Sequence, residues 1–208
     1  MTQRLDRLKE SPSQTAGPYV HIGATPNWVE ITGVWKEDLG LVIAGPDTKG
    51  ESILIKGRIL DGSGESVRDA LVEIWQADAD GLHPSPAEMR GNADPAFTGW
   101  ARQPVSDADG SFSFKTIRPG RVPYPDGRLQ APHVTVWIVA RGINLGLHTR
   151  VYFSDEAEAN ATDPVLSRIP DPARRSTLVA PKSMCGDIPG FTFDIRLQGE
   201  GETVFLDM

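Results

Sequence analysis

Apolar and polar residues alternate along several short segments of this 208-residue chain, and turns rich in glycine and proline separate those segments. A period of two is typical of strands with one buried face. The 21 glycines and 17 prolines are a high share for a helical bundle and leave little room for helices. We therefore predict an all-β fold, a two-sheet β-sandwich, with strands over residues 52–60, 69–76, 111–117, 133–140, 147–153, 191–197 and 203–206.

The first two predicted strands flank the turn sequence Asp61-Gly-Ser-Gly64. Turn residues between two alternating runs are typical of a β-hairpin, so we expect these two strands to pair. Helices are expected only over 154–161, where Ser154 could cap the first turn, and over 2–10.

Two stretches, 11–50 and 77–109, have no regular period. Long loops in a compact domain often carry function. We divide the chain into an N-terminal arm over residues 1–50, which we expect to contribute to a partner interface and a substrate pocket, and a β-sandwich domain over 51–208.

Composition limits the function classes. The formal charge of −7 is spread among interspersed acidic and basic residues, which argues against nucleic acid as a partner. Cys185 is the only cysteine, so the chain can form no internal disulfide. Its apolar runs are too short to span a bilayer, and its first residues do not resemble a signal peptide, so we expect a cytoplasmic protein.

Two common catalytic motifs are missing from the sequence. Neither a GxSxG elbow nor a GxxxxGK loop is present, which argues against a serine hydrolase and a nucleotide enzyme.

Metal ligation is the remaining chemistry that the residue types suggest. His133 opens a predicted strand, and the next side chain on the same face is Thr135, a poor ligand for ferric iron. Tyr124 stands between two prolines, where a phenolate ligand and a packed structural ring are both possible. The candidates for a metal site are His21, His83, His133, His148, Tyr19, Tyr124 and Tyr152.

Residues 57–81 resemble the signature segment of the intradiol ring-cleavage dioxygenases, and residues 11–23, 131–153 and 193–208 are also similar to that family. In the catalytic members, two tyrosines and two histidines hold a ferric ion. The resemblance aligns His83 with the first tyrosine, Tyr124 with the second, and His133 and Thr135 with the two histidines. Only Tyr124 and His133 keep the residue type of the aligned ligand, and two ligands are too few to hold the ion. The resemblance therefore implies no catalytic and no metal-binding residue in this chain.

The departures resemble the non-iron subunit of two-chain family members. That resemblance implies a homologous iron-binding beta subunit that holds Fe(III), with O2 and a small aromatic substrate, 3,4-dihydroxybenzoate, at the interface between the subunits. It implies no membrane or nucleic-acid partner. The substrate-binding residues that it carries over are Thr15, Gly17, Pro18, Tyr19 and Arg141. A guanidinium is suited to fix the ring carboxylate.

Two alternatives stay open. The chain could be a single-chain, homo-oligomeric catechol-type dioxygenase whose divergent metal site uses His83, Tyr124 and His133, with or without His148. It could also be a non-catalytic, transthyretin-like binding module in which Arg141 is an ordinary turn arginine.

Overall fold

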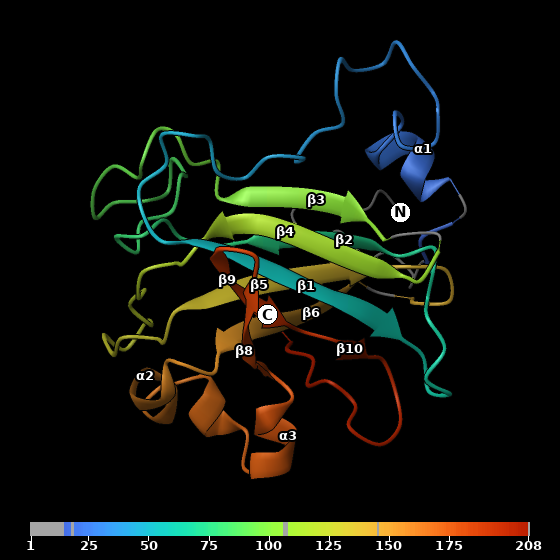
Figure 1. Cartoon of the computed structure of the whole chain (residues 1–208). Coiled ribbons are helices and arrows are strands. Elements are labelled where there is room, and N and C mark those ends of the chain that lie inside the picture. Colours follow the sequence, from blue (N-terminus) through green and yellow to red (C-terminus); the bar gives the residue numbers. More distant parts are fainter. Residues whose placement is uncertain (1–14, 18, 106–107, 145, 208) are drawn as a thin grey trace, which may run out of the picture.

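The computed structural model describes residues 15–17, 19–105, 108–144 and 146–207, and these form two mixed β-sheets packed face to face (Figure 1). In the first sheet, β1 (Ser52–Leu60) pairs antiparallel with β4 (Ser111–Ile117). On its other side β1 pairs in parallel with β9 (Ile188–Thr192) and β10 (Ile195–Arg196). The antiparallel partner of β9 is β8 (Lys182–Cys185), which completes this sheet.

The second sheet has the order β3-β2-β5-β6-β7. It consists of β3 (Trp100–Pro104), β2 (Leu71–Trp75), β5 (His133–Val139), β6 (Leu147–Phe153) and β7 (Val179–Ala180). The first four strands pair antiparallel with their neighbours, and β7 pairs in parallel with β6. The predicted all-β, two-sheet sandwich is confirmed.

The core lies between the two sheets. Ile53 and Ile55 of β1 are buried in one cluster with Val72 of β2 and Val134 and Val136 of β5. Successive side chains of a strand point to opposite faces, so the apolar positions of β5 fill the core while His133 and Thr135 point to the other face of the sheet. The alternation in the sequence therefore places His133 and Thr135 on the face of β5 that points away from the core between the sheets.

Short helices lie outside the sandwich. They are α1 (Val20–Ala24), α2 (Ala157–Ala161), α3 (Pro172–Ser176) and the 3-10 turn Leu166–Arg168. Within the described ranges, no helix is long and apolar enough to cross a membrane. Helix α2 begins later than predicted, with Glu156 and not Ser154 at its N-cap. The predicted helix over 2–10 lies outside the described residues.

The predicted hairpin is wrong. β1 and β2 lie in different sheets, because the chain turns at Asp61–Gly64 and then crosses from one sheet to the other. The local turn does exist: Asp61 Oδ1 accepts hydrogen bonds from the backbone N–H groups of Ser63 and Glu65, and Val67 N donates to Ile59 O at 2.9 Å. Beyond this contact, β1 pairs with β4, β9 and β10, whereas β2 pairs with β3 and β5.

Other predicted strands need smaller corrections. The range 191–197 is divided between β9 and β10, and the range 203–206 is not a strand. Its backbone bonds three separate elements: Thr203 N donates to Arg196 O, Val204 N to Thr177 Oγ1, and Leu206 N to His148 O. Strands β3, β7 and β8 were not predicted.

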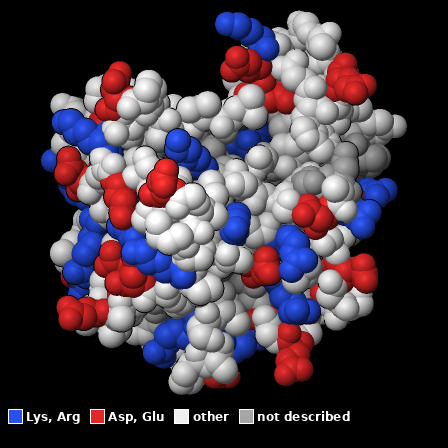
Figure 2. Space-filling model, in the orientation of Figure 1, with Lys and Arg blue, Asp and Glu red and all other residues white. Residues whose placement is uncertain are grey.

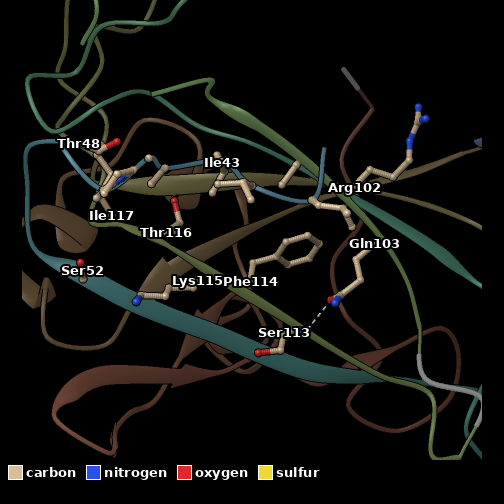
Figure 3. Close-up of a pocket in the computed structure, with 16 residues that line it drawn as sticks. Ile43, Thr48, Ser52, Arg102, Gln103, Ser113, Phe114, Lys115, Thr116 and Ile117 are labelled. Carbon is tan, nitrogen blue, oxygen red and sulfur yellow. Dashed lines mark hydrogen bonds between the residues drawn. The ribbon is translucent and has the colours of Figure 1, made fainter. Parts of the chain in front are cut away.

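The arm segment 41–48 covers the edge of the sandwich where β3 and β4 lie side by side. A cavity of about 520 Å³ lies beneath it, and Figure 3 shows Ile43, Phe114 and Ile117 among the side chains that surround it. Gln103 Oε1 accepts a hydrogen bond from Ser113 N at 2.8 Å and joins the two edge strands. None of the predicted site residues lines this cavity.

Candidate functional site

The arm and the turn after β5 meet at a small pocket of about 250 Å³. Gly17, Val20, His21, Asp69 and Arg141 line it. Two of the predicted substrate-binding residues, Gly17 of the arm and Arg141 of the turn, are therefore brought together from positions far apart in the sequence. Pro18 lies outside the described residues.

Thr15 fastens the arm to this turn. Its Oγ1 accepts a hydrogen bond from Gly142 N at 3.0 Å and lies 3.3 Å from Ala140 O. These two backbone groups flank Arg141, so one side chain of the arm fixes the backbone on both sides of the arginine.

Arg141 presents its charge at the rim of the pocket. Its Nε forms an ion pair with Asp69 Oδ2, while 67% of the side chain remains exposed. Because Asp69 is bonded through Nε, the terminal nitrogens are available to an anion. The pocket therefore offers an oriented guanidinium, the type of group that binds a carboxylate with two hydrogen bonds.

His21 and Asp69 complete the pocket, and neither was among the predicted substrate-binding residues. His21 is buried in α1, and its Nε2 lies 3.2 Å from the backbone O of Asp69. That contact requires the proton on Nε2, so the imidazole donates and anchors α1 to the segment that carries Asp69. The sequence around His21 does not predict this role, because the contact joins residues 48 positions apart.

Tyr19 precedes α1 as its N-cap residue, and it is not one of the residues that line the pocket. The residue is 75% exposed, which leaves its ring free for a partner or a ligand. Tyr19 therefore faces solvent and not the pocket.

The second region of interest is the position that corresponds to the family's iron site. His133 is buried at the start of β5, and its Nδ1 bonds Ala131 O at 2.8 Å. Burial first, and the Arg150 charge second, lower the pKa of His133 to about 4. His83 lies close enough to contribute to that shift, and burial also lowers the pKa of His83. Both imidazoles are therefore neutral at pH 7.

The other groups at this position do not fit a ferric ion. Thr135 adds a neutral hydroxyl on the face that holds His133. The Tyr124 hydroxyl lies 3.3 Å from Arg168 Nη1, and burial raises the pKa of Tyr152, which keeps it a neutral phenol. A ferric site needs anionic ligands to offset its charge. In the described part of the chain, no group of three or more His, Cys, Asp or Glu side chains could hold a metal ion.

His148 does not join this position. On β6 it lies opposite Trp137, whereas His133 lies opposite Tyr152. Four residues of extended chain, roughly 13 Å, separate the two points on the sheet. Within one chain, His148 therefore cannot share a metal ion with His133.

Comparison with known proteins decides the family. The sequence model described as Dioxygenase matches residues 24–199, more than half of the chain. The chain is 44% identical over 207 residues to the protocatechuate 3,4-dioxygenase alpha chain of Pseudomonas putida, covering 98% of each sequence. The chain belongs to the intradiol ring-cleavage dioxygenase family.

Further relatives agree with this family membership. The chain is 41% identical to the protocatechuate 3,4-dioxygenase alpha chain of Burkholderia cepacia, with 97% of this chain and 98% of that one covered. It is 33% identical to the beta chain of the same enzyme from that organism, covering 74% of this chain and 67% of that one.

Solved structures support the fold of this dioxygenase-family chain. The dioxygenase domain of a dioxygenase–carbohydrate-binding protein fusion from Streptomyces sp. SirexAA-E is 28% identical, with a TM-score of 0.56, covering 81% of this chain and 94% of that one. The 3-chlorocatechol 1,2-dioxygenase of Rhodococcus opacus 1CP is 18% identical with a TM-score of 0.59, covering 80% and 67%.

Proposed function

We propose that this chain is the alpha subunit of a protocatechuate 3,4-dioxygenase and that it works with a homologous beta subunit that holds Fe(III). The complex would cleave 3,4-dihydroxybenzoate between its hydroxyl-bearing carbons, inserting both atoms of O2 to give 3-carboxy-cis,cis-muconate. The observation that carries the proposal is the Arg141 pocket, which offers a fixed cation in a chain that retains only two of the four iron-ligand types. The cytoplasm, a reducing compartment, suits a chain with one cysteine.

The ferric ion would activate the ring oxygens, and this chain would orient the ring. Arg141 binds the carboxylate, while Thr15 and Gly17 shape the pocket around it. Pro18 and Tyr19, the next residues of the arm, are proposed to bind substrate on the strength of the resemblance. Fixing one end of the substrate lets the other end meet the metal in a single geometry, which lowers the entropic part of the barrier.

The arm over residues 1–50 would form much of the interface with the beta subunit. Large apolar side chains are exposed along it, as expected for a surface that a partner covers. They are Tyr19, Ile22, Trp28, Ile31, Val34, Trp35, Leu39, Leu41 and Val42. By contrast, charges of both signs are interspersed over the face in Figure 2, without the one-sign field that a nucleic acid requires.

The test is Arg141→Ala in the complex co-expressed with the beta subunit. Loss of a charge-assisted hydrogen bond to the carboxylate costs about 1.5–3 kcal/mol, so we expect kcat/KM for 3,4-dihydroxybenzoate to fall about 10- to 100-fold. Catechol lacks the carboxylate, and its turnover should change little.

Arg128→Ala is the matched control, because Arg128 is also an exposed arginine paired with an aspartate. A binding module without a catalytic role predicts the same small effect for both variants. Equal kinetics for Arg141→Ala and Arg128→Ala would therefore reject the proposal.

A further inference from the structure

Arg150 lies on the face of the second sheet that carries His133. In the antiparallel pairing of β5 and β6, Thr135 lies opposite Arg150, and His133 lies opposite Tyr152. Directly opposed side chains of two strands share one face and lie within contact distance. The Arg150 side chain therefore starts beside Thr135, the residue that the resemblance aligns with the family's second histidine ligand.

Hydrogen bonds fix this guanidinium at two neighbouring side chains. Arg150 Nη1 donates to Gln130 Oε1 at 2.7 Å and lies 3.4 Å from the Tyr152 hydroxyl. Gln130 is buried, and its Nε2 lies 3.3 Å from Pro123 O, in the turn that carries Tyr124. Arg150 is therefore connected both to its own strand and to the turn that holds a former ligand position.

The positive charge of Arg150 is not cancelled at close range. The hydrogen bonds described for Arg150 go to two uncharged groups, Gln130 Oε1 and the Tyr152 hydroxyl, and within the described residues its buried Nε has no hydrogen-bond partner. The Asp163 carboxylate is linked to Arg150 only through the Tyr152 hydroxyl, which lies 3.4 Å from Arg150 Nη1 and 3.2 Å from Asp163 Oδ1. A guanidinium stays charged at every pH that the fold tolerates.

We propose that the Arg150 guanidinium takes the place of the metal cation and excludes metal ions from this chain. Loss of two ligands lowers the affinity for metal, and the fixed charge beside His133 opposes any cation that the remaining donors could attract. Repulsion between like charges is strong in a site with little water, and it grows with the charge of the ion. Arg150 thus opposes metal binding by its charge, in addition to the affinity lost with the missing ligands.

The experiment restores the ligand set and varies the charge. The background is the full chain with His83→Tyr and Thr135→His, to which Arg150→Gln or Arg150→Lys is added. Glutamine removes the charge but keeps a polar side chain, and lysine keeps the charge. Co²⁺ affinity is measured from its visible absorption, and circular dichroism checks that each variant is folded.

We expect the restored background with Arg150→Gln to bind Co²⁺ at least about tenfold more tightly than the background that retains Arg150. The version with Arg150→Lys should bind about as weakly as the version with the native arginine. Arg58→Gln, an exposed position, is the control for net charge and should leave the affinity unchanged. Equal affinity with arginine and glutamine, including no binding by either, overturns the proposal, as does a lysine variant that binds like glutamine.

A second measurement covers variants that do not fold alone. In the complex co-expressed with the beta subunit, iron is counted per pair of chains by mass spectrometry. The Arg150→Gln version of the restored background should gain iron over the version that retains Arg150. An equal iron count in the two complexes contradicts the exclusion.

Discussion

Asp69 carries no sequence signal that separates it from other turn aspartates, yet it is central to the Arg141 pocket. Its carboxylate pairs with Arg141, and its backbone carbonyl accepts the hydrogen bond of His21. Arg141 and the arm residues could be proposed from a resemblance because they lie in recognisable segments. Asp69 and His21 could not, since their contacts join distant parts of the chain and depend on the folded strand order.

Asp69→Asn tests whether this carboxylate positions Arg141. Without the ion pair, the exposed arginine samples more conformations, so in the co-expressed complex we expect the KM for 3,4-dihydroxybenzoate to rise about 3- to 10-fold while kcat stays within about twofold. Asp69→Glu should restore part of the effect. A lower KM in Asp69→Asn would mean that Asp69 competes with the substrate instead of positioning its partner.

His133 makes a separate prediction about pH. Its pKa is about 4 in the folded chain and 6.5 ordinarily, so the unfolded chain binds a proton in this window that the folded chain does not. The stabilisation from His133 is fully present above pH 6.5 and is lost as the pH falls to 4. It amounts to about 3 kcal/mol at most.

His133→Gln removes this titration. In urea unfolding between pH 7 and pH 4, we expect the free energy of unfolding of the variant to fall less steeply than that of the wild type. Parallel curves for the two proteins would show that His133 is not held neutral.

At the scale of elements, the sequence predicted strands well where apolar residues alternate along one face. It predicted them poorly where contacts with neighbouring elements, and not the local pattern, determine that a strand forms. β1, β4, β5 and β6 alternate clearly and were predicted. β3 was missed because an edge strand needs little apolar surface, and its sequence Trp-Ala-Arg-Gln-Pro has no regular alternation. The hairpin prediction failed because turn chemistry is local, whereas the sheet that each strand joins is set by the whole core.

Gly57 tests the packing of β1 against the break between β9 and β10. A Cβ at this position would lie 1.9 Å from Phe193 O and 3.0 Å from the Phe112 ring. The close approach is therefore possible only for glycine, and Gly57→Ala should lower the free energy of unfolding by about 1–3 kcal/mol in urea titrations.

Gly23→Ala is the control for that substitution. A Cβ at Gly23 has nothing within 4 Å, and the residue lies in α1, so alanine should be neutral or slightly stabilising. If both alanine variants unfold at the same urea concentration, the close packing of Gly57 does not limit the stability of the sheet.

At the scale of the whole molecule, the chain has a well-packed sandwich and an arm that exposes much apolar surface. The Arg141 pocket opens beside that arm, and the former iron position retains Tyr124 and His133 without the full ligand set. Both features fit the proposed division of labour, in which this chain would orient the substrate and a partner would supply the metal. The sequence alone could suggest this division by resemblance, but the Asp69 and Arg150 contacts required the fold.

The most direct test measures iron and O2 consumption for the full chain purified alone and for the same chain co-expressed with its beta homologue. We predict that the chain alone contains no stoichiometric iron and consumes no O2 with 3,4-dihydroxybenzoate, whereas the complex contains iron and is active. Full iron occupancy together with full activity in the chain alone would contradict the proposed division of labour.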